Sequence, residues 1–207
     1  MLAALLALAA AAGRAGAQAP AGETGRWTAE LFAGAGAPRG DLGDVADDGL
    51  LAGVALGRRL SPRVAIRLEG TFESLERGGR PSLLGGARGP GVHLWHYVAG
   101  VEALLTRPAR TEWRLGGFAG LGGTYLDVAP ALVPEGVEVS PALARGFTGH
   151  EFTLRGALLA GWAPGGDLVL FARGGAFLML GDAGDPEGSF LGKEAVFTHE
   201  AGVRVLF

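Results

Sequence analysis

Four histidines are the residues of this sequence best suited to acid–base chemistry: His93, His96, His150 and His199. A histidine base needs a nucleophile such as serine within hydrogen-bond reach. No His-x-Ser pair occurs in any segment that reads as a strand. We therefore interpret the histidines as rim and loop residues, and we expect neither a catalytic residue nor enzymatic activity.

The sequence offers no convincing metal, cofactor or nucleic-acid site. Cysteine is absent, which excludes thiolate zinc sites and disulfides. Four aspartates cluster at 41–48, but their spacing does not match the alternating pattern of a calcium loop. The glycine-rich stretches 78–91 and 182–192 lack the strand–loop–helix context of a phosphate-binding loop. The net charge is −3 and the basic residues are scattered, so we expect no nucleic-acid partner.

The elements that could position functional residues are strands, because hydrophobicity alternates with period two and glycine is too frequent for stable helices. No stretch beyond residue 20 approaches the ~20 apolar residues of a transmembrane helix. The alternation predicts eight strands, at roughly 27–36, 49–59, 63–76, 94–106, 112–126, 151–162, 168–180 and 195–207.

Proline and aspartate, which are poor residues for a central strand, all fall between these segments beyond the N-terminal region. The connections alternate between tight turns, such as Leu60-Ser61-Pro62, and long loops, the longest covering 127–150. Short periplasmic turns and long outer loops are typical of transmembrane barrels. The sequence therefore predicts an all-β fold: an eight-stranded, antiparallel, up-and-down transmembrane β-barrel.

The apolar face of the predicted strands carries aromatic residues at its two ends and small aliphatic residues between them. Aromatic rings prefer the headgroup level of a membrane, so two rings of them bracket a hydrocarbon band. The predicted periplasmic girdle contains Trp27, Trp113, Trp162 and Phe207, and the predicted outer girdle contains Trp95, Tyr97, Tyr125, Phe152 and Phe197.

The opposite face carries five glutamates and five arginines interleaved with glycine. An eight-stranded barrel is just wide enough for its own side chains, and each charge inside it must be paired. We therefore predict a closed network of ion pairs in the lumen rather than a pore. The ten residues are Glu30, Arg67, Glu69, Glu73, Glu102, Arg114, Arg155, Arg173, Glu200 and Arg204.

Both ends of the sequence read as export and insertion signals. The apolar run from Leu2 to Ala12, followed by Ala15-Gly16-Ala17, predicts a helical signal peptide cleaved after Ala17. We expect residues 1–17 to be this peptide, 18–26 a short segment and 27–207 the barrel. The C-terminal octapeptide resembles the outer-membrane insertion signal, with Glu200, Gly202, Val205 and Phe207 at its defining positions.

On these features the chain resembles the outer-membrane protein β-barrel family, in the eight-stranded class that includes the outer membrane protein A barrel. The hairpin at 60–70 (LSPRVAIRLEG) is similar to turn-and-strand hairpins of that class. The resemblance implies an integral outer-membrane location and insertion by the outer-membrane assembly machinery. It implies no particular activity, because function does not follow from fold.

We expect a non-enzymatic, monomeric barrel that contacts outer-membrane lipid and lipopolysaccharide, and that contributes to envelope integrity or to surface interaction through its long outer loops. If there is a ligand site, we expect it in loop 127–150. The alternatives are a narrow channel for small solutes, a lipid A-modifying enzyme, and a soluble lipocalin-like barrel with the two faces inverted.

Overall fold

The computed structural model describes residues 24–78, 87–106, 112–139, 141–165, 167–181 and 193–207. The predicted signal peptide, residues 1–17, lies outside the described residues. The strands are β1 (Trp27–Arg39), β2 (Ala46–Arg59), β3 (Val64–Arg77), β4 (Val92–Leu104), β5 (Trp113–Val128), β6 (Phe147–Gly165), β7 (Leu168–Leu180) and β8 (Lys193–Leu206). Two short helices, α2 (Asp41–Val45) and α4 (Pro141–Arg145), interrupt the strand order.

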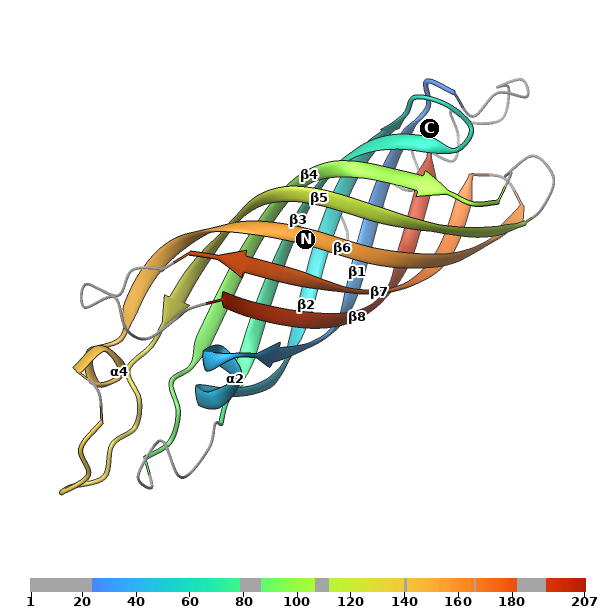
Figure 1. Ribbon diagram of the computed structural model, residues 1–207. Helices are drawn as coiled ribbons and strands as arrows, with labels where there is room; N and C mark the ends of the chain where they lie inside the picture. Colours follow the sequence, from blue (N-terminus) through green and yellow to red (C-terminus); the bar gives the residue numbers. More distant parts are fainter. Residues whose placement is uncertain (1–23, 79–86, 107–111, 140, 166, 182–192) are drawn as a thin grey trace.

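The eight strands form one closed barrel, in which each strand pairs antiparallel with its sequence neighbour and β8 pairs with β1 (Figure 1). Following the paired residues from Thr28 through every strand returns to β1 at Pro38, ten residues farther along. This shear tilts the strands by about 40° from the barrel axis. The prediction of an eight-stranded antiparallel barrel is confirmed.

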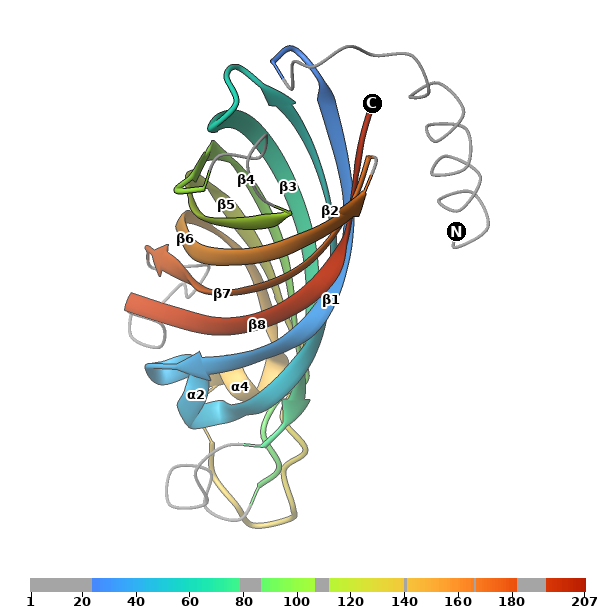
Figure 2. The same cartoon turned by 90° about the vertical axis from the view of Figure 1, so that its right-hand side faces the viewer.

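The two ends of the barrel differ in their connections. At one end the chain turns tightly from β2 to β3, where the Ser61 hydroxyl accepts the backbone N–H of Val64. Trp27 and Phe207 also meet at this end, through two backbone hydrogen bonds of 2.8 and 2.9 Å. Helices α2 and α4 both lie at the opposite end (Figures 1 and 2). We call these the periplasmic end and the outer end.

Burial alternates along the strands, as the two faces of a barrel wall require. Charged residues, small residues and phenylalanines such as Phe32 and Phe177 are buried on the inner face, whereas exposed leucine, valine, tryptophan and tyrosine side chains lie on the outside. No helix in the described part of the chain is long and apolar enough to cross a membrane.

Several strands reach farther than the alternation predicted, so the expectation that proline and aspartate never enter a strand is wrong. Pro38 and Asp127 each lie one residue from the end of a strand, where few backbone bonds are lost. Asp48 and Pro164 lie at register shifts, between Asp47 and Gly49 and between Trp162 and Gly165. A bulge removes a residue from the regular ladder and so tolerates these types.

The β1–β8 closure makes a specific prediction at Gly34. A Cβ added to Gly34 would lie 1.9 Å from the backbone oxygen of His199, whereas a Cβ added to Gly70 meets nothing within 4 Å. We expect Gly34→Ala to destabilise the folded barrel by about 2 kcal/mol or more. Gly70→Ala is the matched control and should leave it unchanged. The measurement is the heat-modifiable gel shift across a urea series, and equal midpoints for the two variants would contradict the clash.

Candidate functional site: a closed charge network inside the barrel

The centre of the lumen is occupied by four arginines and four glutamates. They come from six strands, because inward-facing positions on β1, β3, β4, β6, β7 and β8 converge at similar heights. Their side chains are at most 3% exposed, and their formal charges cancel. The members are Glu30, Arg67, Glu69, Glu102, Arg155, Arg173, Glu200 and Arg204. We call this set the lumen network.

Arg204 and Arg67 organise the periplasmic half of the lumen network. Arg204 donates through Nε to Glu30 at 2.8 Å and through Nη1 to Glu102 at 2.7 Å, and its Nη2 also reaches Glu102. Arg67 donates to Glu30 at 3.0 Å and to Glu69 at 2.8 Å. The planar guanidinium suits such forked contacts, in which one group holds two carboxylates.

Arg173 and Arg155 organise the outer half. Arg173 donates through Nη1 to Glu69 at 2.8 Å and through Nε to Glu200 at 2.6 Å. Arg155 also donates to Glu200, and its Nη1 donates to the Thr198 hydroxyl at 2.8 Å. Because Glu69 accepts from Arg67 as well as Arg173, it joins the two halves into one network.

Phenylalanine rings complete the surroundings of the guanidinium groups. The Arg155 guanidinium lies 4.1 Å from the Phe177 ring centroid, that of Arg173 lies 4.5 Å from Phe32, and that of Arg67 lies 5.2 Å from Phe118. A cation over an aromatic face is attracted to the ring, most strongly where water is excluded. The rings therefore fill the lumen and also stabilise its charges.

A second polar cluster lies on the outer side of the network, around His96. Its Nδ1 is 2.7 Å from the Thr124 hydroxyl, its Nε2 is 3.4 Å from Glu73, and its ring stacks on Phe177 at 3.9 Å. The expectation that all histidines are rim or loop residues is therefore wrong for His96. The cause is strand parity: Trp95 and Tyr97 face outward, so the residue between them faces inward.

The His96 cluster contains an acid, an imidazole and a hydroxyl in sequence, which is the order of a nucleophile triad. Glu73, His96 and Thr124 are nevertheless at most 2% exposed. These three side chains are thus enclosed within the described part of the barrel. Among the described residues, no group of three or more metal-ligating side chains is placed to hold a metal ion.

The remaining predicted lumen charge, Arg114, is also buried, on β5 near the periplasmic end. Arg59, Glu151 and Glu194 are buried as well, although they are not among the ten predicted lumen charges. Strand parity is the sequence feature that could have identified Arg59 and Glu151 as inward-facing, because each shares a face with neighbouring inward residues of its strand. Glu194 lies one residue before the predicted start of its strand.

Apolar side chains close the lumen above and below these charges. At the outer end Leu42 of α2 packs into a buried cluster with Leu94, Leu126 and Met179, and the Leu42 backbone N–H donates to Glu194 at 2.9 Å. At the periplasmic end Ala163, Val169 and Leu206 form another buried cluster. The lumen is thus filled at three levels.

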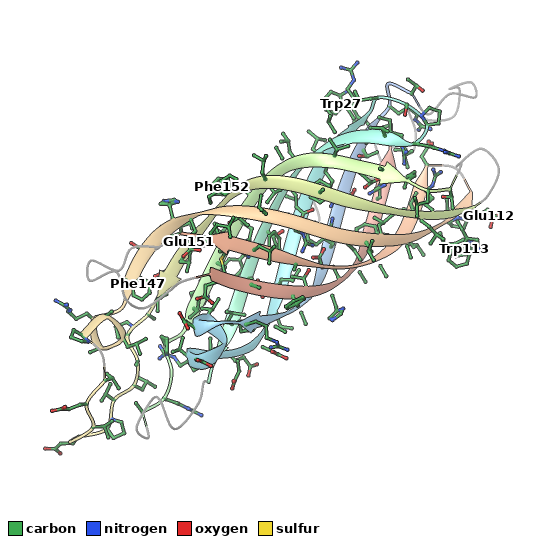
Figure 3. The ribbon with its side chains drawn as sticks, viewed as in Figure 1. Trp27, Glu112, Trp113, Phe147, Glu151 and Phe152 are labelled. Carbon is green, nitrogen blue, oxygen red and sulfur yellow. The ribbon has the colours of Figure 1, made fainter. Side chains whose placement is uncertain are left out.

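The outside of the barrel presents an exposed apolar belt between two sets of aromatic residues. Trp27 and Trp113 lie toward the periplasmic end and Phe152 toward the outer end (Figure 3). Phe197 pairs in register with Ala37, ten residues from Trp27 along β1. At a rise of about 3.3 Å and a tilt of about 40°, this corresponds to about 25 Å of height, the thickness of an outer-membrane hydrocarbon band. The other exposed or half-exposed girdle residues are Trp95, Tyr97, Tyr125, Trp162 and Phe207.

The residues of the predicted insertion signal have definite places in the folded barrel. Glu200 belongs to the lumen network. Gly202 leaves room for neighbouring atoms, because an added Cβ would lie 2.4 Å from the backbone oxygen of Leu31, 2.7 Å from the Cβ of Phe32 and 2.8 Å from the ring of Phe171. Val205 pairs with Ala29 across the closure, and Phe207 bonds to Trp27 through the backbone. Recognition of this segment by the assembly machinery stays a prediction.

Glu69 is the position where one substitution should damage the network most. Glu69→Gln removes the carboxylate shared by three arginines and leaves buried positive charge without compensation. We expect a loss of about 3 kcal/mol or more in the free energy of unfolding, measured by urea titration in detergent micelles. Glu76→Gln on the exposed end of β3 is the control and should change stability by less than about 0.5 kcal/mol. Equal midpoints would show that the network contributes nothing.

No family model matches the sequence. No curated protein matches it either. Solved structures do match the fold. The crystal structure of Neisserial surface protein A superposes with a TM-score of 0.60 at 14% identity, covering 87% of this chain and 97% of that one. Ail, the attachment invasion locus protein of Yersinia pestis, matches at 0.53 and 13%, covering 89% and 99%.

A structure of Ail in complex with the heparin analogue sucrose octasulfate matches at a TM-score of 0.52 and 14% identity, covering 89% of this chain and 99% of that one. Identities this low show the fold alone. The fold and the exposed apolar belt together place the chain as an integral protein of the bacterial outer membrane. Its fold is that of the eight-stranded outer-membrane β-barrels.

Proposed function

We propose that this chain is a non-enzymatic, non-conducting outer-membrane barrel that acts at the cell surface through the folded segments at its outer end. The observation that carries the proposal is the filled lumen, in which the charge network lies between apolar clusters at both ends. A barrel without a path for solutes can interact with other molecules only through its rim and its outer wall.

The two alternatives, a narrow channel and a lipid A-modifying enzyme, have less support. A narrow channel would need a water-filled path past Glu69, which three arginines contact. A lipid A-modifying enzyme would need a base beside a nucleophile at the membrane surface. In the described part of the chain, the one histidine with a triad-like hydroxyl partner is His96, and it is buried.

The outer segments form a cap with a small core of its own. We define the cap as α2, residues 87–91, residues 129–139 and residues 141–146. Val45, Ala131 and Leu143 form its buried cluster, with Ala87 and Val139 packed against it. The backbones of Arg88 and Leu132 bond to each other at 2.9 and 3.0 Å. This ordered cap gives a surface protein a defined shape to present.

The charge of the cap favours a cationic or neutral partner. Its described acidic residues outnumber its basic ones, and the basic ones are Arg88 and Arg145. Leu132, 53% exposed, adds an apolar contact at the far end. The heparin analogue in the Ail complex is a polyanion, so the acidic cap does not support the same ligand here. The acidic members of the cap are Asp41, Asp44, Glu135 and Glu138.

The absence of a solute path is tested by recording from the purified barrel in planar bilayers. We expect no stable current steps, because the lumen network and both apolar clusters would have to separate before ions could pass. The heat-modifiable gel shift of the same preparation shows that the barrel is folded. Reproducible ohmic steps from the folded protein would overturn the proposal in favour of a narrow channel.

The role of the cap is tested by replacing residues 131–145 with a short glycine–serine linker. The barrel should still fold, because β5 and β6 pair along the whole membrane-spanning height without this segment. We expect the binding of bacteria to cultured cells to fall to the level of a strain lacking the gene. As a control, Glu112→Gln at the periplasmic end should not change binding. Unchanged binding by the linker variant would remove the cap from the proposal.

A further inference from the structure

In the described part of the chain, the lipid-facing wall presents one groove along β7 and another, of about equal size, over β2. One, of about 400 Å³, runs along β7 and is lined on the outside by Leu158, Ala160, Ala172, Gly174 and His199. We call it the β7 groove. The other, also about 400 Å³, lies over β2 and is lined by Ala29, Val54, Leu56, Leu68 and Gly70. The two differ in one respect, since only the β7 groove has a polar side chain on its outer surface.

Small residues form the floor of the β7 groove and larger ones form its walls. Ala172 and Gly174 leave the β7 backbone uncovered. Leu158 stands on one side, 77% exposed, and His199 stands on the other. The imidazole leans over β7, because its Nδ1 is 3.8 Å from the position of a Cβ on Gly174. The result is a trough that is wide enough for a hydrocarbon chain and has an imidazole along one edge.

His199 has no hydrogen bond or ion pair with any other residue that the structure describes. A neutral imidazole carries one N–H donor and one acceptor nitrogen. In hydrocarbon, where water does not reach, an unsatisfied polar group is costly. A side chain of this type on the lipid-facing wall therefore calls for a polar atom supplied from the membrane.

The position of His199 along the wall sets the depth in the membrane at which the lipid must supply this polar atom. His199 is two residues from Phe197 of the outer girdle, which corresponds to about 5 Å below the headgroup level. Ester and hydroxyl oxygens near the sugar or glycerol end of a lipid lie at this depth. The groove extends from there toward the periplasmic end, through Gly174, Ala172 and Ala160.

We propose that the β7 groove binds an acyl chain of lipopolysaccharide, with His199 hydrogen-bonded to an ester or hydroxyl oxygen at the sugar end of that chain. Lipopolysaccharide is the lipid of the outer leaflet, and His199 faces that leaflet. The proposal depends on the outer-membrane location of the barrel and is independent of the role of the cap.

The test is native mass spectrometry of the folded, delipidated barrel, titrated in detergent with hexa-acylated lipid A and separately with phosphatidylethanolamine. We expect one lipid A molecule per barrel at low lipid concentration. His199→Leu should weaken this binding about fivefold through loss of one hydrogen bond. Gly174→Leu should weaken it at least about tenfold by filling the groove. The added Cβ makes only ordinary contacts at Gly174, so the barrel should still fold.

Gly70→Leu is the matched control, since it fills the β2 groove and its added Cβ meets nothing within 4 Å. It should leave lipid A binding unchanged, and the heat-modifiable gel shift should report all three variants as folded. Three outcomes would overturn the proposal: wild-type affinity in both β7-groove variants, an equal loss in Gly70→Leu, or equally tight binding of phosphatidylethanolamine. A variant that lacks the gel shift would report a folding fault, and the remaining β7-groove variant then decides.

Discussion

The closure of β8 onto β1 is the constraint on which the rest of this structure depends. In a membrane every backbone donor and acceptor needs a partner within the protein, and a sheet with a free edge cannot satisfy this. Twelve register pairs, from Thr28–Leu206 to Arg39–Ala195, join the two strands. Closing eight strands with a shear of ten residues also sets the lumen width, which leaves room for side chains and little else.

The interior charges follow from that narrow lumen, and they in turn reinforce the closure. β8 supplies both Glu200 and Arg204, and each forms ion pairs with a different one of the two strands that flank β8. Arg204 crosses to Glu30 on β1, whereas Glu200 accepts from Arg173 on β7. At the periplasmic end Arg26 bonds to Asp167 at 2.5 Å and to the backbone of Leu206, so the start of β1 is tied to the β6–β7 turn and to the end of β8. The C-terminal strand is therefore held by backbone, ion pairs and packing at once.

The strands could be predicted from sequence because two different surroundings act on them. Lipid outside and a packed polar lumen inside impose period-two alternation, and it appears in every strand. The same parity places His96 and Glu151 on the inward face. The sequence-based prediction did not include them, because it judged His96 by its possible catalytic chemistry and because Glu151 is the first residue of its predicted strand.

Other features had no signal in the sequence. Ion-pair partners depend on the shear: Glu69 and Arg173 are 104 residues apart, and only the closed register brings them together. Helix α2 is five residues long, and its buried Leu42 and Val45 pack against residues from other strands and loops. Such a segment has no period of its own. The cap was accordingly expected only as long loops, without its internal core.

The distribution of charge separates the parts of the barrel that maintain the fold from those that can meet other molecules. The formal charges of the eight members of the lumen network cancel, so the network adds no net charge to the barrel. Beyond the network the signs are sorted: Arg59 and Arg114 lie toward the periplasmic end, whereas Glu151 and Glu194 lie toward the outer end, beneath an acidic cap. Among the residues that the structure describes, acidic side chains therefore outnumber basic ones at the outer end. Charge of one sign at a rim attracts molecules of the opposite sign over about a Debye length, whereas a filled, neutral lumen attracts none. The polarity that the barrel presents to the cell exterior is thus set at its rim and cap, while the lumen serves to keep the wall closed.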